Sequence, residues 1–206
     1  LPINDYLFAL PGGPADIGLG NFYADQDGVV RRFLPTLFDD GTMPSLMFAT
    51  LLSVRAAGLK PTSSSWSLGG REIPNSILPQ AIGFVGPPGT IPRLSFSQLL
   101  NSQANEQSLK DKVVIVAAEY LGNQDIHLTP YAHGFLGLES RMMSGAELHA
   151  NIIETLLTGR FPRSVPGWLH LLYSAIVLTI GIALFFRLKP WWGLGAGLLL
   201  ILVCTV

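Results

Sequence analysis

The chain has 206 residues, of which 49% are hydrophobic and only 13% are charged, with a formal net charge of −1. An average soluble domain carries about 25% charged residues, so this composition argues against an ordinary water-soluble globule and against intrinsic disorder. Thirteen Lys and Arg against fourteen Asp and Glu leave no basic surface for phosphate backbones, and the single cysteine excludes an internal disulfide and four-cysteine zinc sites. We therefore expect no nucleic-acid partner.

Two β-rich runs, residues 17–23 and 29–38, flank a turn sequence at 25–28 and predict a β-hairpin. The turn resembles the start of a calcium loop, but the third acidic ligand and the closing Glu are absent at the required spacing, which favours a tight turn. The two arginines after it alternate faces, so we expect one to point inward or to an edge, with an aspartate of the turn as its partner. The turn motif comprises Asp25, Asp27, Gly28, Arg31 and Arg32.

Short elements are predicted between this hairpin and residue 118. Residues 113–118, VVIVAA, form a short, β-branched apolar run that is typical of a strand buried on both faces. The other elements are a helix from Ser45 to Gly58, a small hairpin at 66–73, a strand at 81–85 and a short helix from Ser95 to Leu100.

A long loop, residues 119–143, precedes the clearest helix signal in the chain. Ser144 and Glu147 fit a capping box, and Gly159 stands at the expected end of the helix. The helix has a polar arc that includes Glu147, while His149 lies in the middle of the apolar arc. A buried histidine needs a hydrogen-bond partner, so His149 is either a satisfied core residue or a ligand contact at the edge of the sheet.

The loop after VVIVAA is the candidate ligand site, because ligands of open α/β sheets bind beyond the carboxyl ends of the strands. An alternative is that Asx turns merely hold this loop in shape. With His149, the candidate ligand-binding residues are Gly122, Asn123, Asp125, His127 and Thr129.

No recognised catalytic or metal-binding motif is present. The sequence contains no G-x-S-x-G, P-loop, G-x-G-x-x-G or H-E-x-x-H pattern, and Glu147 and His149 are two residues apart, so they face different sides of a helix. We therefore predict no catalytic residue, no metal ion and no cofactor for this segment.

The end of the chain predicts membrane helices. Residues 165–186 are 22 residues without a charge, which spans roughly 33 Å as a helix and matches a bilayer core of about 30 Å. A turn at 187–190 contains Arg187 and Lys189, which favours a cytoplasmic turn and an external position for residues 1–164. Residues 191–206 then begin a second span that is shorter than the roughly 20 residues required. A buried helical hairpin in a soluble core is the less favoured alternative.

Several stretches together resemble the CHASE2 domain, an extracytoplasmic sensor module of bacterial receptors. Ser144 departs mildly from the family, which often has Pro before the glycine, and the loop at 119–143 is long. The stretches that carry the resemblance are residues 18–22, 25–32, 95–97 and 109–116, Asp125 with Thr129-Pro130, and residues 145–151, followed by membrane helices.

The resemblance implies a receptor in the cytoplasmic (inner) membrane, with several spans and with this chain as part of a longer protein. It implies an upstream span and opening strands, an undefined extracytoplasmic ligand or protein cue, and a cytoplasmic output domain in the same polypeptide: a nucleotide cyclase, histidine kinase, diguanylate cyclase or Ser/Thr kinase. A homodimer is expected if the output domain must dimerise. The resemblance supplies no catalytic residue.

The predicted fold is α/β, a mixed sheet with flanking helices that is incomplete at the N-terminus, followed by two transmembrane helices of which the second is truncated. The leading hypothesis is a sensor domain at 1–164 that signals through the helix at 165–186. A second hypothesis is a membrane-anchored extracytoplasmic enzyme that uses Asp125, His127, Glu147 and His149. A third is a passive assembly scaffold with an exposed apolar face.

Overall fold

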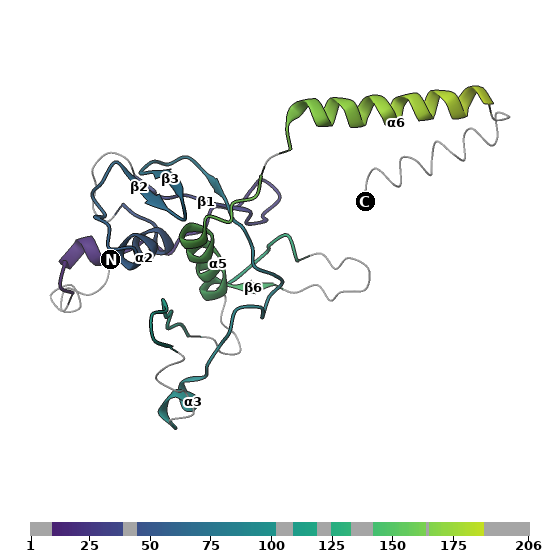
Figure 1. Cartoon of the computed structure of the whole chain (residues 1–206). Helices are drawn as coiled ribbons and strands as arrows, with labels where there is room; N and C mark the ends of the chain where they lie inside the picture. Colours follow the sequence, from purple (N-terminus) through teal and green to yellow (C-terminus); the bar gives the residue numbers. More distant parts are fainter. Residues whose placement is uncertain are drawn as a thin grey trace. The chain divides into compact units, whose positions relative to one another are not determined.

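The computed structural model describes residues 10–38, 45–101, 109–118, 125–132, 142–163 and 165–187. The chain divides into two compact units, with the boundary after Pro162. The first unit contains, in chain order, η1 (Gly13–Asp16), β1 (Arg32–Phe33), α2 (Phe48–Ala56), β2 (Ser65–Leu68), β3 (Arg71–Pro74), β4 (Gln80–Ala81), α3 (Phe96–Leu100), β5 (Ile126–His127), β6 (Met143–Ser144) and α5 (Gly145–Thr158) (Figure 1). The second unit contains α6 (Gly167–Arg187).

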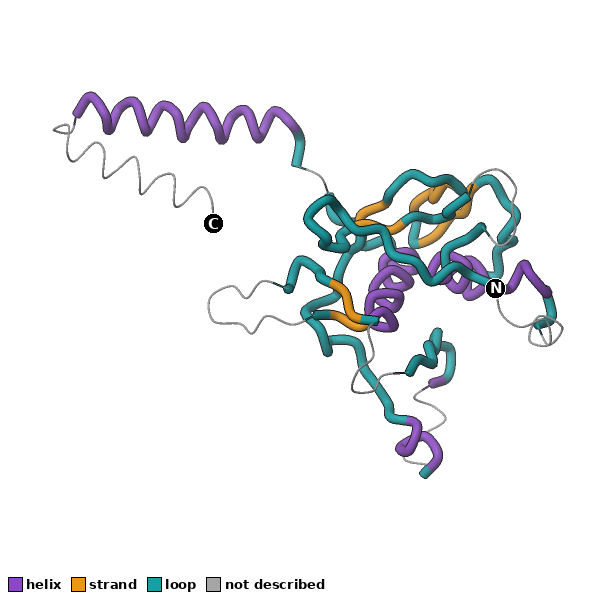
Figure 2. Tube along the Cα trace, turned by 180° about the vertical axis from the view of Figure 1, so that it is seen from behind, coloured by secondary structure: helices purple, strands orange, loops and turns teal. Residues whose placement is uncertain are grey.

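The strands form small antiparallel pairs. Among the described residues, β1 pairs with β4, β2 with β3 and β5 with β6, each as a two-stranded sheet (Figure 2). Isolated parallel bridges join Leu19 to Met47 and Val29 to Leu128. The predicted α/β class is confirmed, but the strands of the described residues form small pairs rather than one mixed sheet.

The β2–β3 hairpin follows its turn chemistry. Gly69 and Gly70 both have positive φ, 55° and 76°, as a type I′ turn requires. Trp66, in β2, is buried, and its indole N–H donates to the carbonyl of Lys60 at 2.8 Å. Ile73, opposite Trp66 in the register, is fully buried as well. The hairpin predicted at 66–73 is therefore confirmed.

Helix α5 lies at the centre of the hydrophobic core and packs against α2, β2 and β6 (Figure 1). Its N-cap Ser144 accepts a hydrogen bond from the amide of Glu147 at 3.4 Å, and Gly159 ends it in the left-handed conformation. Both predicted ends are confirmed. In a complete capping box the Glu147 side chain would accept the amide of Ser144. The Glu147 carboxylate binds Gly89 and Arg93 of a different segment instead. The buried apolar side chains of α5 are Leu148, Ile152, Ile153 and Leu156.

Helix α2 begins three residues later than predicted, at Phe48. Leu46 and Met47 are held in an extended conformation by bridges to Thr36 and Leu19, so the backbone turns helical only after them. The short helix α3 carries the predicted cap: Ser95 and Gln98 form a complete capping box.

The prediction for residues 113–118 is wrong. The segment forms no strand among the described residues, and Val114 and Val116 are 53% and 87% exposed, while Ile115 packs against the core. A strand buried on both faces lies within a sheet whose two faces are covered by other elements. In the described residues no strand pairs with this run, so its apolar composition alone does not bury it.

Of the strand predicted at 81–85, only Ala81 belongs to a strand, β4. Side chains of α5 accept hydrogen bonds from backbone amides of the residues that follow. The amide of Gly83 donates to Thr155 Oγ1 at 3.0 Å, and the amide of Val85 donates to Asn151 Oδ1 at 2.9 Å. Asn151 and Thr155, on the polar side of α5, are thus buried, because they take the place of a neighbouring strand. The strand predicted at 29–38 is likewise reduced to β1, although Val29 is buried.

Helix α6 has 21 residues, and most of its described side chains are exposed, Trp168 and Leu171 among them. Within the described residues, no helix meets the combined length and apolarity that a bilayer span requires. The span predicted at 165–186 therefore stays a prediction, and the second, at 191–206, lies outside the described residues.

Candidate functional site

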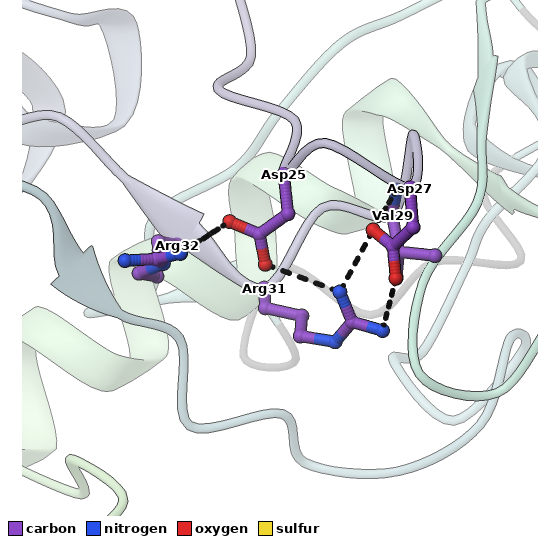
Figure 3. Close-up of polar contacts among 5 residues, drawn as sticks. All are labelled: Asp25, Asp27, Val29, Arg31 and Arg32. Atoms are coloured by element: carbon purple, nitrogen blue, oxygen red, sulfur yellow. Dashed lines mark hydrogen bonds and ion pairs between the residues drawn. The ribbon is translucent and has the colours of Figure 1, made fainter.

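The turn motif forms a compact network of ion pairs (Figure 3). Arg31 contacts both carboxylates: its Nη2 donates to Asp27 Oδ2 at 2.8 Å and its Nη1 donates to Asp25 Oδ2 at 3.1 Å. Arg32 donates to Asp25 Oδ1 at 2.7 Å. The predicted Asp partners are confirmed, but neither arginine points inward, because both side chains are nearly half exposed.

The hydrogen bonds of the network favour the charged states of Asp25, Asp27 and Arg31. Hydrogen bonds from Arg31 and from the amide of Val29 lower the pKa of Asp27 to about 2. Burial raises the pKa of Asp25, but hydrogen bonds from Arg31 and Arg32 outweigh it and leave the pKa below its ordinary value. Gly28, with a φ of 78°, allows the turn that brings the carboxylates and arginines together. The motif therefore stabilises a tight turn, as predicted.

Two candidate ligand residues come together at the N-terminus of α5. His127 Nε2 lies 2.9 Å from Asp125 Oδ1. The amide of Gly145 donates to the carbonyl of Asp125 at 3.0 Å, and a Cβ at position 145 would lie 2.3 Å from the Asp125 carboxylate oxygens. Gly145 therefore permits the close approach that places the carboxylate at the positive end of the helix.

An aromatic ring joins His127 to His149. The Phe22 ring centroid lies 4.4 Å from each imidazole, and Phe48 packs edge-on against His149 at 5.0 Å. Burial lowers the pKa of His149 to about 4, although the charge of Asp125 opposes this shift. His149 is therefore neutral at pH 7.

The His149 environment is apolar and tightly packed. Its Nδ1 is buried and has no hydrogen-bond partner among the described residues. The hollow beside the ring has a volume of about 10 Å³, which is room for about one water molecule. His149 is thus held against Phe22 and Phe48 rather than at an open ligand cavity, and its role in ligand binding stays a prediction.

The other candidates lie elsewhere. Thr129 is fully buried, and its Oγ1 accepts the amide of Tyr131 at 3.4 Å. Gly122 and Asn123 lie outside the described residues. Of the predicted ligand set, the structure therefore groups Asp125, His127 and His149, and a role for the set in binding stays a prediction.

Glu147 serves a different segment. Its buried carboxylate accepts the amides of Gly89 at 2.8 Å and Ile91 at 3.4 Å and pairs with Arg93 at 2.5 Å. A carboxylate committed to three donors is not available to the Asp125–His127 pair. Among the described residues, no group of three or more His, Cys, Asp or Glu could hold a metal ion.

A larger cleft lies at the other end of α5 and was missed by the sequence analysis. It has a volume of about 400 Å³ and is lined by residues 83–85, Tyr131 and residues 160–162. Phe84 and Tyr131 meet there edge to face, with centroids 6.0 Å apart. Its walls come from three distant segments, so no local motif could reveal it. The sequence feature that could have indicated it is Arg160-Phe161-Pro162, a basic and an aromatic residue directly after the helix end at Gly159.

The structure thus presents a mixed α/β domain with an aromatic-lined cleft and a carboxylate–histidine pair, joined in sequence to a long apolar helix. The family model of the CHASE2 domain matches residues 4–185, and the chain belongs to this family of extracytoplasmic sensory domains. The resemblance noted from the sequence is confirmed. Searches of curated proteins and of solved structures returned no match.

Proposed function

We propose that residues 1–164 form the extracytoplasmic sensor of a bacterial transmembrane receptor and that residues 165–186 relay its state to a cytoplasmic output domain. The observation that carries this proposal is the extent of the family match, which covers the first unit and runs through α6 to residue 185. The region that the family model matches thus comprises a sensory domain and the helix that follows it.

The membrane position rests on the sequence and on α6. Residues 165–186 carry no charge, and a 21-residue helix is roughly 32 Å long, close to the bilayer core of about 30 Å. Exposed apolar side chains such as Leu171 and Leu178 are suited to lipid. The described part of α6 alone does not meet the requirements of a span, so membrane topology is the property to measure.

The topology test uses single cysteines in a Cys204→Ser background. A membrane-impermeant maleimide added to intact spheroplasts is expected to label Leu78→Cys, whose parent side chain is 60% exposed. It is expected to label Leu188→Cys, in the predicted cytoplasmic turn, only after permeabilisation. Equal labelling of both cysteines from outside, or release of the protein by a carbonate wash, would contradict the proposal.

The relay would use the short connection between α5 and α6. Gly159 ends α5, and α6 begins at Gly167, so a shift of the first helix reaches the second through few residues. The output domain proposed is a nucleotide cyclase, histidine kinase, diguanylate cyclase or Ser/Thr kinase in the same polypeptide, and a dimer is proposed where that output requires one. The full reading frame is expected to continue into such a domain. A stop codon soon after the second predicted span would contradict the relay.

One contact favours the alternative of a membrane-anchored enzyme. Asp125 and His127 form a hydrogen-bonded pair, the arrangement that orients a histidine base. His149 and Glu147 do not complete it, since one packs among phenylalanines and the other binds residues 89–93. An esterase or phosphatase activity abolished by His127→Gln would support this alternative.

The scaffold alternative is favoured by the exposed apolar side chains Val114 and Val116. It predicts that Val114→Lys with Val116→Lys abolishes self-association measured by analytical ultracentrifugation. An unchanged sedimentation coefficient would argue against it.

A further inference from the structure

The cleft at the C-terminal end of α5 is framed by close backbone contacts. The carbonyl oxygen of Arg160 lies so near Gly83 that an added Cβ at position 83 would be 1.8 Å from it. Thr155 Oγ1 accepts the amide of Gly83 from the adjoining turn of the helix. A second close contact involves Gly159, the residue before Arg160. A Cβ added at Gly69 would lie 2.1 Å from the amide nitrogen of Gly159. The two walls, residues 83–85 and 160–162, are therefore held at a defined separation before any ligand binds.

The lining combines flat rings with one cation. Phe84 and Tyr131 contact each other edge to face. The guanidinium of Arg71 lies over the ring of Phe161, 4.4 Å from its centroid. Arg160 is exposed and has no ion-pair partner among the described residues, and none of the described residues lining the cleft is acidic. Two guanidinium groups near an uncharged aromatic surface make the local potential positive.

The volume and chemistry match a small ligand. A cleft of about 400 Å³ lies within the range of about 300–1,000 Å³ that small-molecule sites occupy, and such sites combine apolar walls with few polar groups. A guanidinium binds a carboxylate through two parallel hydrogen bonds, and aromatic rings favour flat apolar bodies.

We propose that this cleft binds a small aromatic carboxylate, with its carboxylate on Arg160 and its ring against Phe84 and Tyr131. Binding itself requires only the geometry of the first unit. Its signalling role rests on the proposed function: Arg160 and Phe161 lie in the connection that leads to α6, so a bound ligand that holds both residues would favour one conformation of that connection.

The experiment measures binding of 2-naphthoate to the intact chain in phosphatidylcholine nanodiscs, by isothermal titration calorimetry. The neutral 2-naphthalenemethanol serves as a probe with the same ring and no charge. Arg160→Gln removes the guanidinium at an exposed position, and Arg163→Gln is the matched control, because this exposed arginine does not line the cleft. Phe84→Leu tests the ring contact separately.

Saturable binding of 2-naphthoate is expected, with a Kd weakened roughly tenfold or more in Arg160→Gln, as loss of a charge-assisted hydrogen bond implies, and unchanged in Arg163→Gln. Phe84→Leu is expected to weaken both probes, and the alcohol is expected to bind wild type and Arg160→Gln alike. Equal naphthoate binding by Arg160→Gln and Arg163→Gln, or no saturable binding to the wild type, would overturn the proposal. Neither outcome bears on the cysteine-labelling test of topology, so failure of the ligand site is distinguishable from failure of the receptor assignment.

Discussion

Replacing Thr155 by valine tests whether the buried polar stripe of α5 holds the extended segment at residues 82–85. The substitution keeps the shape and the β-branched character of the side chain but removes its hydroxyl. In the native structure that hydroxyl accepts the amide of Gly83 at 3.0 Å and donates to the carbonyl of Asn151 at 2.7 Å. Thr155 is fully buried, so valine would leave the Gly83 amide without its acceptor.

The expected loss is about 1–3 kcal/mol of unfolding free energy, the cost of leaving one buried donor unsatisfied. For a domain of this size, that corresponds to a decrease in Tm of roughly 2–12 °C. Thr158→Val is the matched control on the same helix, because among the described residues its exposed hydroxyl bonds only to the carbonyl of Glu154, at 2.6 Å. Its expected effect is within about 0.5 kcal/mol.

Hydrogen exchange measured by mass spectrometry supplies the local test. Thr155→Val is expected to increase exchange in peptides that contain the Gly83 amide, and Thr158→Val is expected to leave them unchanged. If both variants lose the same stability, or if exchange near residue 83 is the same in both, the hydroxyl does not anchor this segment and the account of the reduced strand is wrong.

Three further predictions concern the core and the titrating groups. Leu156→Ala, at a fully buried position, is expected to cost about 2–5 kcal/mol in denaturant unfolding, and a loss below 1 kcal/mol would refute its place in the core. Because the pKa of Asp27 is about 2 in the folded state, below its ordinary value of 3.8, the ion pair stabilises the fold above the ordinary value, and this contribution is lost as the pH falls toward 2. Asp27→Asn should therefore flatten the acid limb of a plot of Tm against pH, and an unchanged limb would count against the pairing with Arg31. His149 has a folded-state pKa of about 4, below its ordinary value of 6.5, so the unfolded chain binds its proton more tightly and stability falls as the pH drops from 6.5 toward 4. His149→Phe is expected to remove this decline, and a decline of equal size in the variant would show that another group causes it.

The candidate site could be predicted only where its residues are neighbours in the chain. The pairing of the aspartates and arginines at 25–32 followed from a turn signal and opposite charges a few residues apart, and the structure confirms it. The contact of Phe22 with both His127 and His149 joins three distant segments, and nothing in the local pattern indicates it. The aromatic cleft was missed for the same physical reason, because its lining residues come from three segments that are far apart in the chain.

Side-chain polarity misled where it was translated directly into exposure. Asn151 and Thr155 lie on the polar side of an amphipathic helix, yet both are buried because they accept hydrogen bonds from the backbone of residues 83–85. Val114 and Val116 are apolar, yet both are exposed because no strand pairs with them among the described residues. In both cases burial depended on whether another segment of the chain supplied a hydrogen-bonding partner. The sequence of one segment alone does not contain that information.

The amino-acid sequence by itself determined the features that depend on local interactions. Ser144 and Gly159 set the ends of α5, and the Gly69-Gly70 pair set the β2–β3 turn, because caps and turns are energetically complete within a few residues. It also determined the family, through motifs spread along the chain. The tertiary structure alone decided which strands pair, which polar groups are buried and where the cleft lies. These depend on contacts between residues that are far apart in the chain, whose energies exist only when the whole domain has packed.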